Sequence, residues 1–145
     1  SGPYLQYAYA RVCTLLEKAA ATDGAATDVA ATDGAATDGE TQVSPNPFDK
    51  ESGSFGVVEP VEKRLALALL EFPGAVVRAA EAYKPSVLAD YLFQTAQLYS
   101  SFYQNAPILK SEAAVRNARL RLCALFGKVL KTGLNLLGIE TPSRI

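Results

Sequence analysis

The stretch PSVLADYLFQTAQLYSSFY, from Pro85 to Tyr103, predicts the fold class of this chain. Its apolar side chains recur at steps of three and four residues, which places them on one face of an α-helix. The members of this stripe are Leu88, Tyr91, Leu92, Thr95, Leu98, Tyr99 and Phe102. Pro85 suits the first turn of a helix, and Pro107 closes it. We therefore expect a long amphipathic helix with one buried face.

Four further helices are predicted by the same spacing on either side of this one. They cover residues 3–20, a short stretch from Pro60, a second short stretch from Pro73, and residues 111–136. The inner face expected for the last helix is Val115, Ala118, Leu122, Leu125, Phe126 and Val129. No stretch alternates with the period of two that a strand requires. The expected fold is all-α, one domain over residues 1–145 built as an antiparallel bundle of about five helices.

An acidic segment interrupts this pattern. Residues 21–40 repeat the sequence A-T-D-G/V-A, and small polar residues of this kind bury too little surface to offset the entropy of ordering. We expect residues 21–58 to form a long disordered insert loop between the first and second helices. The formal net charge of −1 therefore hides two unlike parts, because residues 21–59 carry −7 and the other 106 residues carry +6. A basic body of this kind suits a polyanionic partner.

The composition excludes several classes of activity. The chain has no histidine, which removes Ser-His-Asp and Cys-His catalysis as well as the commonest metal ligand. Its two cysteines, Cys13 and Cys123, lie in helical patterns and are expected to be buried free thiols. No apolar run reaches the length of a membrane span, and no signal-peptide pattern is found at the start. We expect a cytoplasmic location, no membrane contact and no metal site.

Basic residues are concentrated in the last helix. Arg121, Lys128 and Lys131 follow one outer stripe, whereas Arg116 and Arg119 form a second cluster near its start. Two interpretations remain open at this point. The stripe is either a solvated face, as on most amphipathic helices, or a set of contacts to phosphate groups.

The aromatic residues leave a similar choice. Tyr99 and Tyr103 lie four residues apart, on a side of their helix next to the predicted core. They form either the rim of a packed bundle or a surface on which splayed nucleobases stack. The spacing alone does not decide between these interpretations.

Four segments resemble one known family, the C-terminal DALR-type anticodon-binding domain of arginyl-tRNA synthetases. They are PYLQYAYAR (3–11), EKRLALALLEFPGAVVRAA (62–80), PSVLADYLFQTAQLYSSFYQNAPIL (85–109) and ARLRLCALFGKVLKTGLNLLGIETPSRI (118–145). They occur in the family's order and spacing, and residues 21–58 have no counterpart in the resemblance. The family ends in Met where this chain has Ile145, and Ser143 stands where a Glu is common.

The resemblance implies a function and a set of residues. Arginine codons are CGN and AGR, so every arginine anticodon has C in the middle, and the family reads this base after unstacking it. Tyr103 and the terminal Ile145, with Arg144 beside it, are the implied pocket residues. Tyr7, Arg11 and Tyr99 are further candidates for the same surface. The implied partners are an arginine tRNA and the enzyme's own catalytic domain, with the protein a monomer.

The resemblance also implies where catalysis takes place. Aminoacylation with ATP and Mg²⁺ belongs to a separate catalytic domain, whose HIGH signature needs histidines that this chain lacks. We therefore expect tRNA binding without a cofactor and without catalysis. Two alternatives remain, namely a helical protein-interaction module without RNA binding, and the equivalent domain of a cysteinyl- or glycyl-tRNA synthetase.

Overall fold

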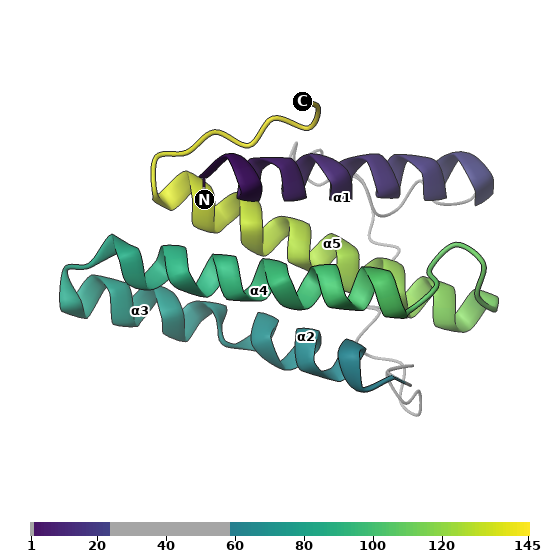
Figure 1. The fold of residues 1–145 in the computed structure, drawn as a ribbon, viewed down its shortest axis with the longest axis horizontal. Helices are drawn as coiled ribbons and strands as arrows, with labels where there is room; N and C mark the ends of the chain where they lie inside the picture. The colour runs from purple at the N-terminus through teal and green to yellow at the C-terminus, as the bar shows by residue number, and fades with distance from the viewer. Residues whose placement is uncertain (1, 24–58) are drawn as a thin grey trace, which may run out of the picture.

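A computed structural model describes residues 2–23 and 59–145, and five α-helices account for most of that part of the chain (Figure 1). They are α1 (Gly2–Asp23), α2 (Pro60–Leu70), α3 (Phe72–Ala82), α4 (Pro85–Asn105) and α5 (Ala113–Leu136). The described ranges contain no strand, so the all-α prediction is confirmed. Helix α1 continues three residues past its expected end. The rest of the acidic segment, 24–58, lies outside the described residues.

The long helix α5 occupies the centre of the bundle. It packs against α1, α2 and α4, and the α2–α3 pair lies along α4. Figure 1 shows that α5 runs opposite to α1 and α4, whereas α1 and α4 point in the same direction. Prolines in the first turns of α2, α3 and α4 start these helices, since proline lacks the N–H that the first turn leaves unpaired. Helices α1 and α4, which both pack against α5, also contact each other.

The core is continuous through the bundle. Its largest fully buried apolar side chains are Phe102, Phe126, Leu65, Leu92, Leu130 and Leu134. Gly133 lies inside α5, where a Cβ atom would stand 2.7 Å from the Leu92 Cδ2 atom. The absence of a side chain at Gly133 therefore allows α4 and α5 to approach closely.

A glycine turn ends α5 and reverses the chain. Gly138 has a φ of 75°, and the N–H of Ile139 donates to the carbonyl of Leu134 at 2.9 Å. Such a left-handed residue with back-bonded amides is a common way to cap the last carbonyls of a helix. The tail after Gly138 then runs along α1 toward its middle (Figure 1).

The inner face of α5 differs from the predicted one. Arg116 and Arg119 are buried, whereas Leu125, which was expected to face the core, is 44% exposed. The prediction was wrong here because amphipathic analysis assigns every charged residue to the solvent side. In this bundle the buried stripe of α5 passes through both arginine positions.

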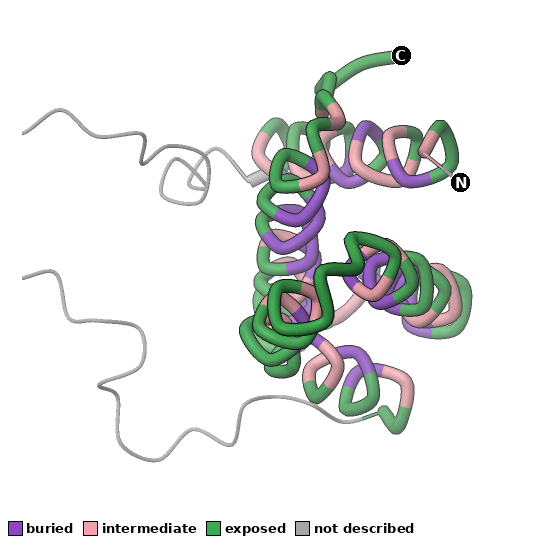
Figure 2. Tube along the Cα trace, turned by 90° about the vertical axis from the view of Figure 1, so that its left-hand side faces the viewer, coloured by how far each residue is buried: buried purple, intermediate pink, exposed green. Residues whose placement is uncertain are grey.

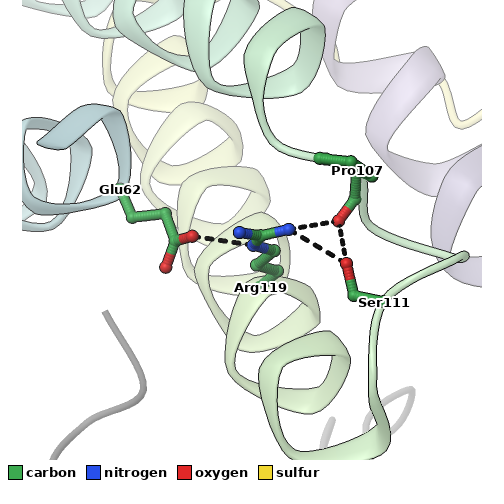
Figure 3. Close-up of polar contacts among 4 residues, drawn as sticks. All are labelled: Glu62, Pro107, Ser111 and Arg119. Carbon is green, nitrogen blue, oxygen red and sulfur yellow. Dashed lines mark hydrogen bonds and ion pairs between the residues drawn. The ribbon is translucent and has the colours of Figure 1, made fainter. Parts of the chain in front are cut away.

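A buried ion pair explains how Arg119 is accommodated (Figure 3). Its Nε donates to the Glu62 carboxylate at 2.7 Å, and Glu62 is fully buried at the start of α2. Its Nη1 donates to the Pro107 carbonyl and, at 3.0 Å, to the Ser111 hydroxyl oxygen. Ser111 also donates to the Pro107 carbonyl. One guanidinium therefore ties α2 and the α4–α5 loop to α5, through the rigid fork of donors that arginine provides.

Candidate nucleic-acid interface

A cavity of about 170 Å³ lies between α1 and α4. Its lining residues are Tyr4, Tyr7, Ala8, Arg11, Tyr99, Ser100, Tyr103 and Gln104. The positions follow from helical spacing, because residues 4, 7, 8 and 11 share one side of α1 and the pairs 99/100 and 103/104 share one side of α4. The structure thus brings together the first and third segments of the family resemblance.

Arg11 is the centre of this site. Its guanidinium carbon lies 5.3 Å from the centroid of the Tyr103 ring and 5.8 Å from that of the Tyr7 ring. Both distances lie within the range of cation–π contacts. Tyr7 is 54% exposed and Tyr103 is 42% exposed, so both side chains are partly open to solvent. Within the described part of the chain no carboxylate pairs with Arg11, which leaves its N–H groups available to an anion.

Tyr99 packs between the core residue Phe126 and the partly exposed Tyr103. Its ring is buried and stacks on Phe126, with centroids 4.3 Å apart and planes inclined by 10°. Its hydroxyl points to the Cys123 sulfur at 3.9 Å, and burial raises the pKa of the Tyr99 hydroxyl. Tyr99 was expected to contact a base directly, but it is only 6% exposed at the wall of the cavity and its ring already stacks on Phe126. It instead packs against Tyr103, whose ring centroid is 6.3 Å away.

The C-terminal residues are not brought to the cavity. Arg144 pairs with Glu17 at 3.4 Å, and the Gln6 amide donates to the Glu140 carbonyl at 2.9 Å. Gln6 and Glu17 lie on a different side of α1 from Arg11, by the 100° step between helical residues. Ile145 is exposed and does not line the cavity. The pocket implied by the resemblance, in which Ile145 meets Tyr103, is therefore not assembled in this structure.

The basic residues of α5 fall into two groups. Arg121, Lys128 and Lys131 are exposed, as expected for an outer stripe. The buried residues of α5, such as Cys123 and Leu130, lie on the other side of this helix from Arg121 and Lys128, by the 100° step between helical residues. Figure 2 shows the buried sides of the helices turned toward the inside of the bundle and the exposed sides turned outward. Arg116 and Arg119, which were also predicted to contact phosphate, are buried, so that prediction is corrected. Arg119 neutralises Glu62, and Arg116 approaches the Ala19 carbonyl at 3.5 Å.

Two aromatic residues of this surface were missing from the predicted site. Tyr4, which lines the cavity, and Phe93 have ring centroids 5.5 Å apart and join α1 to α4. Tyr4 could have been found, because it shares a helical side with Tyr7 and Arg11. Phe93 gave a weaker signal, since it lies off the apolar stripe of its helix. The sequence signal for Phe93 was the presence of an aromatic residue outside the apolar stripe of its helix.

The described residues were also searched for metal-ligating groups and reactive thiols. They contain no group of three or more potential metal ligands. Burial raises the pKa of the Cys123 thiol to about 12, so this thiol is protonated at neutral pH and is a poor nucleophile. Cys13 is only partly buried, and both cysteines are free. None of the described helices is long and apolar enough to cross a membrane.

Exposed aromatic rings beside an arginine are the side chains on which unstacked bases commonly stack. Comparison with known proteins identifies the family. The model of the DALR anticodon binding domain matches residues 5–145, and the chain belongs to this family. The match runs across the acidic segment as well as the helices.

Several relatives confirm the resemblance to arginyl-tRNA synthetases. The chain is 41% identical to the arginine–tRNA ligase of Cutibacterium acnes, over 100% of this chain and 24% of the relative. It is 40% identical to the arginine–tRNA ligase of Chromobacterium violaceum, over 97% and 20%. A solved structure, the arginyl-tRNA synthetase of Thermus thermophilus, matches with a TM-score of 0.72 and 33% identity, over 100% of this chain and 21% of that one. The chain thus spans about a fifth to a quarter of the length of these relatives.

Proposed function

We propose that this chain binds the anticodon of an arginine tRNA and holds its middle cytosine against the ring of Tyr103. The observation that carries the proposal is the cavity between α1 and α4, in which Arg11 lies between the exposed rings of Tyr7 and Tyr103. Membership of the DALR anticodon-binding family supports a tRNA partner. The names of the relatives support arginine as the amino acid of that tRNA.

The cavity supplies the groups that an unstacked nucleotide needs. The faces of Tyr7 and Tyr103 offer stacking, which is available to any base. The guanidinium of Arg11 offers a charged donor to phosphate oxygens. The Gln104 amide and the Ser100 hydroxyl both donate and accept hydrogen bonds, as reading a Watson–Crick edge requires. Stacking gives affinity, and the polar groups give the preference for cytosine.

We assign aminoacylation, with its ATP and Mg²⁺, to a catalytic domain outside this chain. The residues described here supply no histidine and no metal-binding cluster for that chemistry. The proposed role of the chain is to position the tRNA for that domain, in a cytoplasmic and monomeric enzyme.

Replacing Tyr103 with alanine should weaken binding of an arginine tRNA by about 1–3 kcal/mol, because one base loses its stacking partner. Changing the middle C of the anticodon should weaken binding to the wild-type chain and have less effect on the variant. Fluorescence anisotropy with arginine tRNA transcripts measures both effects. The control is Tyr103→Phe, which keeps the ring and should keep most of the affinity. Equal dissociation constants for the wild type and Tyr103→Ala would remove the stacking role.

We further propose that the outer stripe of α5 contacts phosphates of the tRNA outside the loop that the cavity holds. The double variant Arg121→Gln/Lys128→Gln should bind every tRNA more weakly and lower the salt slope of binding by about 2, one for each lost contact. A matched control is Lys63→Gln/Lys84→Gln, which removes the same charge from exposed positions on the α2–α3 side. If the control lowers the salt slope equally, net charge alone is responsible and the stripe makes no direct contact.

A panel of tRNAs tests the identity of the partner. Preference for arginine tRNA over cysteine and glycine tRNAs is the expected result. Tighter binding of the cysteine or glycine tRNA would assign the domain to the corresponding synthetase. Failure of all tRNAs to bind at low salt would favour the protein-interaction module without an RNA partner.

A further inference from the structure

The last turn of α4 carries two of the residues that line the cavity, Tyr103 and Gln104. Pro107 stands four residues after Tyr103 and has no N–H, so the Tyr103 carbonyl cannot accept the bond that usually closes a helical turn. The N–H of Ala106 donates to the Phe102 carbonyl at 2.9 Å, and the chain then leaves the helix in an extended conformation. Helix ends of this kind fray unless contacts from outside the helix hold them.

A contact from α5 holds the chain where it leaves α4. The Arg119 Nη1 donates to the Pro107 carbonyl and to the Ser111 hydroxyl oxygen, and Ser111 itself donates to the same carbonyl (Figure 3). The Arg119 side chain is in turn fixed by Glu62, whose carboxylate accepts from its Nε at 2.7 Å. The carbonyl two residues beyond α4 is therefore tied to α5 directly and to α2 through Glu62.

Stability alone accounts poorly for this buried ion pair. The second carboxylate oxygen of Glu62, Oε2, is buried without a hydrogen-bond partner among the described residues. Apolar side chains of similar volume often match or exceed the stability that a buried ion pair provides. Apolar side chains, however, cannot donate to the Pro107 carbonyl. What Arg119 adds is a fixed direction for the chain after α4, because its planar fork of donors holds two partners at once.

We propose that Arg119 is a positioning residue of the RNA site, which acts through Tyr103 and Gln104 without touching the RNA. Its guanidinium fixes the Pro107 carbonyl, and this contact holds the last turn of α4 at the place where the Tyr103 ring meets a base. Arg11 contacts the Tyr103 ring, whereas Arg119 sets the backbone that carries the ring. The inference rests on the proposed function, since it requires RNA bound at this turn.

A variant that restores stability without restoring the hydrogen bond separates positioning from folding. Glu62→Leu/Arg119→Met, called the apolar pair below, replaces both charges and should recover most of the stability that Arg119→Ala loses. It should nevertheless bind arginine tRNA about 3- to 10-fold more weakly than the wild type. Fluorescence anisotropy at low temperature measures the affinity, and urea denaturation measures the stability. Wild-type affinity in the folded apolar pair would refute the positioning role.

Leu69→Ala is the matched control for a purely structural effect. Leu69 is buried in α2, so its truncation should lower stability through the cavity left behind. The neighbouring Ala68 carbonyl accepts from the Tyr91 hydroxyl at 2.6 Å, and Tyr91 lies about 18 Å from Tyr103 along α4. We expect Leu69→Ala to leave the affinity of the folded chain unchanged. An equal loss of affinity in Leu69→Ala and the apolar pair would show that reduced packing is the cause.

A double-mutant cycle shows whether Arg119 acts through Tyr103. In the Tyr103→Ala background, the apolar pair should weaken binding by about 2-fold or less, because the ring that it positions is already gone. Equal fold-losses with and without the Tyr103 ring would contradict the proposal. If the apolar pair does not fold, Ser111→Ala replaces it in the same cycle, since it removes the hydroxyl that contacts both Arg119 and the Pro107 carbonyl.

Amide hydrogen exchange of the free protein tests the inference without RNA. In the apolar pair, the amides of residues 103–106 should exchange about 5-fold faster than in the wild type, and those in the first half of α4 should not change. Unchanged exchange at 103–106 would refute the positioning role even if binding falls. If exchange rises as expected but the wild type binds no arginine tRNA, the proposed function fails and Arg119 serves the fold alone.

Discussion

Replacing Arg119 with alanine is expected to lower the free energy of unfolding by about 3–5 kcal/mol. The reason is the Glu62 carboxylate, which is fully buried and receives its only described hydrogen bond from the Arg119 Nε. Removing the guanidinium leaves a buried charge without a partner, at a cost greater than the net worth of the pair. It also releases the Pro107 carbonyl and the Ser111 hydroxyl, which join the α4–α5 loop to α5. Urea denaturation followed by circular dichroism measures the loss.

The same helix supplies a matched control. Arg121 lies two residues away and is exposed, so Arg121→Ala should change the free energy of unfolding by no more than about 0.5 kcal/mol. A second variant tests the cause. Glu62→Leu combined with Arg119→Met replaces both charges by apolar groups and should recover most of the lost stability. Equal unfolding midpoints for the Arg119→Ala and Arg121→Ala variants would show that the buried pair contributes nothing.

The number and type of helices were predictable because they depend on local patterns. Apolar residues at steps of three and four define the buried stripe of α4, and prolines mark the starts of three helices. The aromatic side of α1 was visible in the same way. Such signals need only neighbours within one or two turns, so a single sequence contains them.

The buried arginines and the course of the tail were not predictable in this way. Whether Arg119 is buried depends on Glu62, which lies 57 residues away and reaches it only after α2 packs on α5. The direction of the tail depends on the turn at Gly138 and on contacts with α1, such as that of Glu140 with Gln6. Local sequence patterns carry no information about these contacts between distant residues.

The residues of the candidate site were also predictable only in part from the sequence. The family resemblance named Tyr7, Arg11 and Tyr103 as candidates, and Tyr7 and Arg11 are four residues apart, which puts them on one side of α1. It could not show that the guanidinium of Arg11 lies near both rings, because that requires α1 and α4 to be adjacent.

Phe126→Ala is expected to have the second large effect, because it acts on both stability and the site. Phe126 is almost fully buried at the centre of α5, and truncating such a ring costs about 3–5 kcal/mol through lost burial and the cavity left behind. Its ring also stacks on Tyr99, which in turn packs against Tyr103. Losing that support should loosen the packing of Tyr103 at the cavity between α1 and α4, so the proposed tRNA affinity should fall even at temperatures where the variant is folded.

The adjacent residue Leu125 provides a matched control for this prediction. Leu125→Ala removes a similar apolar side chain one residue away, but that side chain is 44% exposed, so its loss should cost far less stability and leave RNA binding unchanged. Phe126→Leu fills most of the space and should cost less than the alanine variant, while it still removes the ring that stacks on Tyr99. Unfolding midpoints in urea and dissociation constants at low temperature measure the two effects separately. If Phe126→Ala lowers stability but binds tRNA as tightly as Leu125→Ala, the path from Phe126 through Tyr99 to Tyr103 supports only the core, and Tyr103 is held by Arg11 alone.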